Sequence, residues 1–221
     1  MSSETDKDQE QEVKFLLADP ASLEARLESS GARLIQPRVH EFNLRFDTPD
    51  GQLARASRVL RLRQDSDARL TYKGPSKLDS GVTVRQEIEF RVDDFAAARR
   101  LFEALGFEIE FIYEKYRAVY ALDLKPGRSQ QEAPDELLVT IDQMPFGDFA
   151  EIEGPGSAAI QSAAARLGLN WQARILHSYA AMFKDLKSGH NLNFRDLTFA
   201  NFDGLDIPPA SLGAVPADVG D

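Results

Sequence analysis

The sequence predicts an α+β domain in which eight strands close into a β-barrel and helices pack on its outer surface. Eight segments alternate polar and apolar residues with the period of two that is typical of strands. Four other segments carry apolar stripes at helical spacing. Charged residues in the strand-like segments recur two positions apart, so each strand has one charged face and one apolar face.

The strand-like segments are numerous enough for a barrel, because eight strands in one domain are sufficient to close one. Asp65, Ser66 and Asp67 are suited to a hairpin turn between two of them. Residues 125–135, rich in Gly, Gln, Pro and acidic residues, are predicted to form a mobile loop. The predicted strands cover residues 10–17, 36–47, 57–65, 68–74, 82–92, 109–124, 136–143 and 147–153.

Capping residues mark the boundaries of the predicted helices. Asp19 and Pro20 are typical of a helix start, and Gly31 is typical of a helix end. Asp94 is suited to starting a second helix, which ends before Gly106. The four predicted helices cover residues 19–31, 93–105, 155–167 and 175–187.

The charged faces of the strands point into the barrel if the helices cover its outside. A sheet with one face in water explains any single strand, such as the one in which Arg61 and Arg63 alternate with Leu60 and Leu62. It does not explain why nearly every strand has the same pattern. Because buried unpaired charge is very costly, an interior lined with both signs requires mutual ion pairs or a ligand.

The types of charged residue indicate a phosphate ligand and a divalent cation. Carboxylate oxygens are the ligands that Mg²⁺ and Mn²⁺ prefer, whereas Arg and Lys bind phosphate oxygens. A metal that bridges phosphate oxygens is the usual arrangement for phosphoryl transfer. The candidate metal ligands are Glu10, Glu12, Asp142, Glu151 and Glu153. The cations with the same spacing are Lys14, Arg61, Arg63, Lys73, Arg85, Lys115 and Arg117.

Composition narrows the expected partners and location. The 221-residue chain has a formal net charge of −10, whereas proteins that bind nucleic acid are usually basic, so no nucleic acid is expected. The absence of cysteine excludes disulfides and a Cys-built zinc site. No apolar run is long enough to span a bilayer, and the polar N-terminus is unlike a signal peptide, so we expect a cytoplasmic protein without membrane contact. The oligomeric state stays open, and a homodimer is compatible with the sequence.

Several short motifs follow one another along the chain. Glu10-Gln11-Glu12-Val13-Lys14 has the form ExExK, and Phe149-Ala150-Glu151-Ile152-Glu153 ends the series with ExE. The motifs between them are Leu60-Arg61-Leu62-Arg63, Thr71-Tyr72-Lys73-Gly74-Pro75, Arg85-Gln86-Glu87-Ile88-Glu89, Glu114-Lys115-Tyr116-Arg117 and Ile141-Asp142. A lone ExExK is common, but the ordered set resembles the CYTH, or triphosphate tunnel metalloenzyme, superfamily over residues 8–187.

The resemblance implies a closed tunnel of eight antiparallel strands that holds a small-molecule triphosphate and divalent metal ions, Mg²⁺ or Mn²⁺. It assigns the five acids above to the metal and the seven cations to the phosphates. Glu87 and Glu89 become catalytic candidates, which would bind a second metal ion or orient water. Lys184 would reach into one mouth of the tunnel, although a solvated helix lysine explains it equally well. The tunnel domain is predicted over residues 1–187, with a tail over residues 188–221 that is partly packed or disordered.

Members of this superfamily perform two reactions in a similar tunnel. One is hydrolysis of tripolyphosphate, thiamine triphosphate or nucleoside triphosphates, in which water attacks phosphorus. The other is cyclisation of ATP by class IV adenylate cyclases, in which the ribose 3′-hydroxyl attacks. Because the sequence has no recognisable adenine site, we favour a metal-dependent triphosphatase. A third hypothesis, a polyphosphate-binding module without turnover, would not need so many acids.

Overall fold

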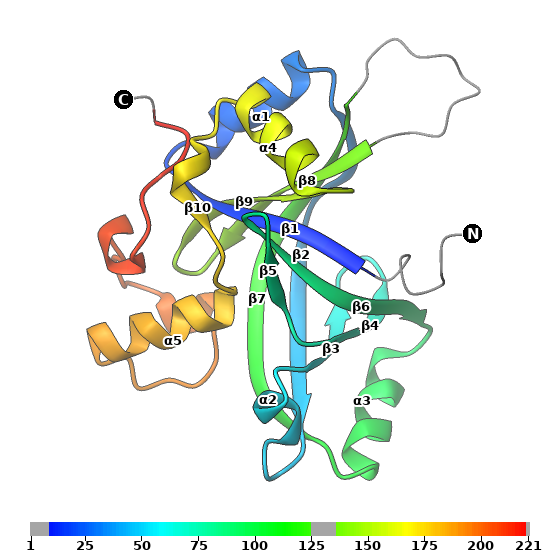
Figure 1. Cartoon of the computed structure of the whole chain (residues 1–221). Coiled ribbons are helices and arrows are strands. Elements are labelled where there is room, and N and C mark those ends of the chain that lie inside the picture. Colours follow the sequence, from blue (N-terminus) through cyan, green and yellow to red (C-terminus); the bar gives the residue numbers. More distant parts are fainter. Residues whose placement is uncertain (1–8, 125–135, 220–221) are drawn as a thin grey trace, which may run out of the picture.

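The strands form one antiparallel sheet that closes into a ring. A computed structural model describes residues 9–124 and 136–219 (Figure 1). In chain order, the ring strands are β1 (Gln9–Leu17), β2 (Arg33–Asp47), β3 (Val59–Gln64), β4 (Ala68–Lys73), β6 (Val82–Val92), β7 (Glu108–Asp123), β8 (Glu136–Met144) and β9 (Gly147–Glu153). They pair in the order β1, β9, β8, β7, β2, β3, β4, β6, and β6 pairs with β1 to close the ring. The strands cross at different angles and do not run evenly round one axis.

The eight ring strands are the eight strands that the alternation predicts, so the predicted closed fold is confirmed. Two short strands were missed, β5 (Lys77–Asp79) beside β6 and β10 (Arg174–Ile175) beside β1. The predicted start of the last helix at residue 175 is wrong, because Ile175 belongs to β10 and pairs with Lys14 of β1. That helix, α5 (Tyr179–His190), begins after Ser178, whose side chain accepts a hydrogen bond from the backbone N–H of Ala181. The predicted loop over 125–135 lies outside the described residues.

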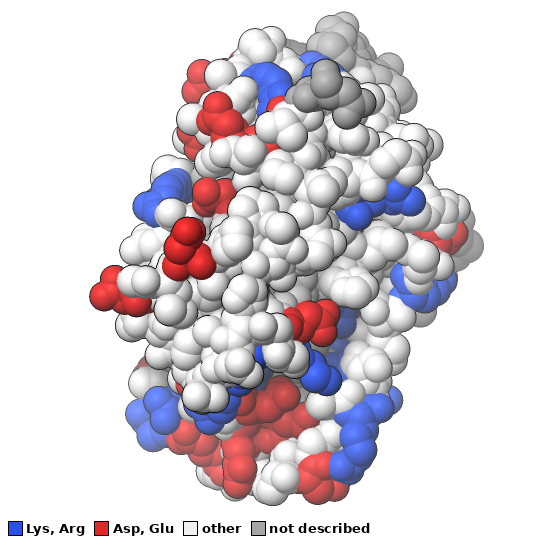
Figure 2. Space-filling model, turned by 90° about the vertical axis from the view of Figure 1, so that its left-hand side faces the viewer, with Lys and Arg blue, Asp and Glu red and all other residues white. Residues whose placement is uncertain are grey.

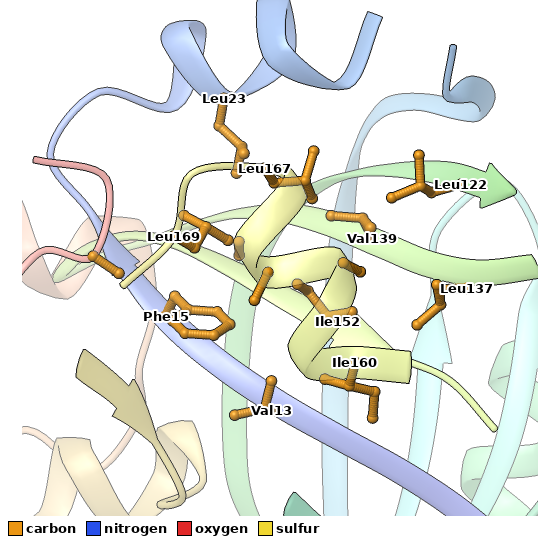
Figure 3. Packing of buried hydrophobic residues seen from close by; sticks show 14 of the residues in the cluster. Val13, Phe15, Leu23, Leu122, Leu137, Val139, Ile152, Ile160, Leu167 and Leu169 are labelled. Carbon is orange, nitrogen blue, oxygen red and sulfur yellow. The ribbon is translucent and has the colours of Figure 1, made fainter. Parts of the chain in front are cut away.

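Two helices cover the outer face of β1, β8 and β9. Leu23 of α1 (Pro20–Ser29) and Ile160 of α4 (Ser157–Arg166) are fully buried against the apolar rows of these strands (Figure 3). Phe15 of β1 and Ile152 of β9 lie at the centre of this cluster. Burying a side chain of this size contributes roughly 1.5–3 kcal/mol, so the cluster fixes which face of each strand points outward. The opposite faces therefore point into the ring.

The outer face of β6 is covered at its start, where Val82 and Val84 are buried, but at Ile88 and Phe90 the expectation that apolar rows lie beneath helices is wrong. Phe102 of α3 (Phe95–Ala104) packs against Phe46, but Leu101 on the same helix is 57% exposed. Ile88 and Phe90 of β6 are 43% and 54% exposed. The helix lies over the strands that carry Leu44, Phe46 and Leu62 and leaves the outer side of β6 open around Ile88 and Phe90.

The segment after α5 packs along the tunnel. Leu197 forms backbone hydrogen bonds with Ile112 and Glu114 of β7, and Ala217 donates one to Leu16 of β1. Short 3₁₀ turns at Phe199–Phe202 and Pro209–Leu212 shape it. The boundary between residues 187 and 188 stays a prediction. Two other short elements, α2 (Gln52–Arg55) and a 3₁₀ turn at Trp171–Ala173, complete the fold. None of the helices described is long and apolar enough to cross a membrane.

Candidate active site

The inward faces of the ring strands line a cavity of about 290 Å³. The strand register explains why charged residues gather there: Glu12 lies opposite Glu153 and Lys14 opposite Glu151, and inward positions then recur every second residue. The prediction that the charged rows face the interior is therefore confirmed. The predicted residues that line the cavity are Glu10, Glu12, Lys14, Arg61, Arg63, Lys73, Arg85, Glu87, Glu89, Lys115, Arg117, Glu151 and Glu153. Asp142 and Lys184 do not line it.

One part of the cavity is crowded with carboxylates around a single lysine. The Lys73 ammonium lies 2.7 Å from a carboxylate oxygen of Glu10 and 2.5 Å from one of Glu87. Burial raises the pKa of Glu153 to about 7, and repulsion by Glu10 and Glu12 contributes to the shift. Burial also raises the pKa of Glu10 to about 7, and its hydrogen bond with Glu87 adds to the effect. The four carboxylates of this acidic cluster, Glu10, Glu12, Glu87 and Glu153, share Lys73 with two more distant cations, Arg61 at 3.9 Å from Glu87 and Lys14 at 4.0 Å from Glu12.

The acidic cluster has the donor chemistry that a divalent cation requires. Carboxylate oxygens are hard ligands for Mg²⁺ or Mn²⁺, and a cation among them would offset the burial and the repulsion that raise the pKa values of Glu10 and Glu153. As they stand, no three carboxylates among the described residues converge closely enough to hold a metal ion. Glu10, Glu12 and Glu153 would have to turn toward one another on binding one.

A second part of the cavity holds the arginines of β3. Glu89 accepts hydrogen bonds from Arg63 at 3.0 Å and from the Thr71 hydroxyl at 2.8 Å. Arg61 lies 3.3 Å from the same carboxylate and also donates to the Tyr113 hydroxyl at 3.2 Å. Although burial opposes the shift, Arg63 and Arg61 lower the pKa of Glu89. Glu89 is therefore placed to position the two guanidinium groups, apart from the acidic cluster.

Asp142, which is itself fully buried, belongs to a third group of residues. Its carboxylate accepts hydrogen bonds from Lys115 at 3.0 Å, from Arg117 and from the Tyr179 hydroxyl at 3.0 Å. The structure thus does not bring Asp142 together with the acidic cluster, and its role as a metal ligand stays a prediction. Glu151 also lies on this side, where it pairs with Arg117 and with Lys14 at 2.6 Å.

Sequence reasoning missed several polar residues that line the cavity or support it. On β2, Glu41, Asn43 and Arg45 alternate with Phe42 and Leu44, so the same period-two signal was present. Glu41 is 1% exposed and pairs with both Arg63 and Lys115, and these cations lower its pKa to about 2 despite its burial. The other missed residues are Gln36, Arg69, Tyr113, Thr140, Ser178 and Tyr179.

Tyr179 reaches the tunnel from α5, outside the ring. Its hydroxyl donates to Asp142, and the Lys14 ammonium lies 4.6 Å from the centre of its ring. We expect Tyr179→Phe to lower the free energy of unfolding by about 1–2 kcal/mol, because Asp142 is buried and loses one of its donors. Turnover should fall several-fold as Lys115 and Arg117 shift.

The measurement is chemical denaturation together with steady-state kinetics on tripolyphosphate. Tyr72→Phe is the matched control, because Tyr72 is partly exposed and its hydroxyl makes no hydrogen bond to a described residue. Equal stability and turnover in Tyr179→Phe and the wild type would contradict a positioning role for Tyr179.

The acidic cluster also predicts how stability depends on pH without metal. The folded pKa values of Glu10 and Glu153 are about 7, against an ordinary value of 4.5, so the folded state binds more protons between these limits. Their contribution to stability is therefore fully present below pH 4.5 and lost as the pH rises through about 7. We expect the melting temperature in EDTA to fall across this window. Thermal scans of the wild type and of the Glu10→Gln/Glu153→Gln variant check this, and an equal fall in both would refute it.

Lys184 lies at the surface of α5 and lines a neighbouring cleft instead of the tunnel. Its side chain makes no ion pair with a described residue. The expected reach into one mouth of the tunnel is thus not seen in this arrangement, and a role in catalysis stays a prediction.

Comparison with known proteins gives one family and several relatives. The model of the CYTH domain matches residues 8–178. A Methanocaldococcus jannaschii protein, MJ0240, named as a proposed adenylate cyclase, is 30% identical over 112 residues, which are 50% of this chain and 63% of the relative. The chain thus spans less than two thirds of that relative.

Solved structures share the fold. A proposed adenylate cyclase from Vibrio parahaemolyticus has a TM-score of 0.66 at 18% identity, over 79% of this chain and 97% of its own. The PH1012 protein from Pyrococcus horikoshii has a TM-score of 0.59 at 25% identity, over 77% and 96%. HpAC1 from Hippeastrum, described as having a dominant triphosphatase activity, has a TM-score of 0.54 at 21% identity, over 81% and 96%.

Proposed function

From the premise that the chain belongs to the CYTH domain family, we propose that it hydrolyses a triphosphate inside its tunnel with the help of Mg²⁺ or Mn²⁺. The observation that carries this proposal is the division of the cavity into an acidic cluster and a wall of cations. Arg61, Arg63, Lys115 and Arg117 line the cavity, and each is held by a carboxylate. A bound triphosphate would compete with these carboxylates for the cations, which supports an anionic ligand of several charges.

The acidic cluster would hold the metal through Glu10, Glu12 and Glu153. When bound there, a divalent cation supplies charge neutralisation at the phosphate oxygens. The arginines hold the phosphates bidentately, and the closed ring excludes most water from their surroundings. Glu87, hydrogen-bonded in the same cluster, is the carboxylate we assign to orienting the attacking water.

The adenylate cyclase reaction is the alternative, and the name of the Methanocaldococcus jannaschii relative favours it. It uses the same cations and differs in the nucleophile. A binding module without turnover is a further alternative. The acidic cluster argues against it, because a protein that only binds an anion would not need so many acids.

One assay separates these functions. Purified protein is incubated with Mg²⁺ or Mn²⁺ and with tripolyphosphate, thiamine triphosphate or ATP, and both phosphate and cyclic AMP are measured. We expect metal-dependent phosphate release and little cyclic AMP. Conversion of ATP mainly to cyclic AMP and pyrophosphate would establish the cyclase instead. Tight binding of tripolyphosphate without either product would establish the binding module.

A further inference from the structure

A second cleft of about 910 Å³ adjoins the tunnel. Both are lined by Glu12, Lys14, Arg45, Phe111 and Ser178, so the two spaces meet at these residues. The cleft lies between α5 and the segment that follows α2. Figure 2 shows the side of the molecule on which α5 lies, where Lys and Arg side chains flank a group of acidic side chains in the lower part. We call this cleft the vestibule.

The vestibule is basic although the chain as a whole is acidic. Among the residues that the structure describes, seven Lys and Arg residues line it against two carboxylates, Glu12 and Glu110, whereas the formal net charge of the chain is −10. Three of the cations, Arg58, Lys184 and Lys187, make no ion pair within the described part of the chain. Like charges gathered in a cleft attract anions and repel one another until an anion binds. The vestibule therefore fits a ligand with several negative charges.

We propose that the vestibule binds phosphate groups beyond the three held in the tunnel, so that linear polyphosphates longer than tripolyphosphate are the preferred substrates. This inference rests on the proposed triphosphatase activity. A chain of phosphates that leaves the tunnel beside Lys14 and Arg45 enters the vestibule, where Arg58 and Lys187 lie further along the lining. Each added phosphate brings a further charge to these unpaired cations.

The aromatic residues of the vestibule favour phosphate over a nucleobase. Phe111 is packed against two other rings, with centroid distances of 5.8 Å to Tyr113 and 5.9 Å to Phe183, both nearly parallel to it. Phe183 itself is 2% exposed. A base would need a free aromatic face for stacking, and these rings already use theirs for one another.

The test compares substrates of different length. Turnover of tripolyphosphate and of a size-fractionated linear polyphosphate is measured for the wild type, for Arg58→Ala/Lys187→Ala, and for the control Lys77→Ala/Arg100→Ala, whose exposed cations lie on β5 and α3. We expect the wild type to have a higher kcat/KM for the longer chain, and the vestibule variant to lose about tenfold of this preference. The control should retain it.

The possible outcomes separate the two proposals. Equal kcat/KM for both chain lengths, or an equal loss on both in the vestibule variant, would overturn the vestibule proposal and leave the triphosphatase intact. Turnover of neither substrate would defeat the triphosphatase, and calorimetric titration with the longer polyphosphate in EDTA then decides whether Arg58 and Lys187 bind it. Faster processing of an oligoribonucleotide with a 5′-triphosphate than of polyphosphate would overturn the proposal in favour of a nucleic-acid chain.

Discussion

Replacing Glu153 with glutamine is expected to reduce turnover of tripolyphosphate by about a hundredfold or more while the protein remains folded. Glu153 lies directly opposite Glu12 on the neighbouring strand, and its pKa is raised to about 7 by burial and by Glu10 and Glu12. A divalent cation would use the ionised carboxylate, which glutamine cannot supply. Glutamine keeps the shape of the protonated side chain, so the melting temperature in EDTA at neutral pH should stay equal or rise.

Metal dependence separates this explanation from a general loss of structure. The activity of Glu153→Gln is measured over a range of Mg²⁺ and Mn²⁺ concentrations, next to Glu103→Gln. This control removes an exposed carboxylate on α3 whose one ion pair with a described residue is with Arg99. We expect the wild type and the control to be inactive in EDTA and the Glu153 variant to be inactive throughout. Wild-type turnover that persists in EDTA would remove the metal from the proposed reaction.

Replacing Arg63 with alanine is expected to remove most of the stabilisation by tripolyphosphate and most of the turnover. Arg63 is 7% exposed and lies between Glu41 and Glu89, at 3.5 Å and 3.0 Å from their oxygens. A phosphate held by its guanidinium group is held in the ground state and in the transition state alike. The wild type should gain melting temperature with tripolyphosphate, because a ligand that binds the native state stabilises it. The alanine variant should gain much less.

Loss of a buried cation also destabilises the empty protein, by roughly 3–5 kcal/mol when its partners remain. Arg63→Lys is therefore the informative second variant, since it keeps the charge beside Glu41 and Glu89 and removes the bidentate fork. We expect it to fold and to recover only part of the turnover. Full activity in Arg63→Lys, or an unchanged response to tripolyphosphate in Arg63→Ala, would indicate that these residues only make structural ion pairs.

The period-two pattern was sufficient to predict the ring and its charged interior, because alternation determines which face of a strand each side chain occupies. Arg61 and Arg63 are on the same wall for this reason alone. The pattern does not determine which side chains form hydrogen bonds inside the ring. It therefore could not predict the contact of Asp142 with Lys115, Arg117 and Tyr179. That contact depends on a helix that packs from outside the ring and on the register in which neighbouring strands pair.

Local sequence patterns also could not predict which strands are covered by helices on the outer surface. Ile88 and Phe90 have the same alternation as Val13 and Phe15, yet the first pair is largely exposed and the second is buried. The difference lies in which helix reaches each strand, which is a property of the whole fold. Conversely, Glu41 and Arg45 had the signal and were overlooked, since no motif drew attention to β2.

The closure of the ring by β1 also has a consequence for synthesis. Gln9–Glu12 pair with β6, Glu12–Leu17 pair with β9, and the Ala18 backbone N–H donates to the side chain of Asp218, 200 positions later. When β1 leaves the ribosome, none of these partners has been made. Val13 and Phe15, almost completely buried in the finished protein, must wait in contact with water or a chaperone until β9 emerges. Such distant pairings make folding slow, so the newly made chain is most prone to aggregate at the strand that completes its tunnel.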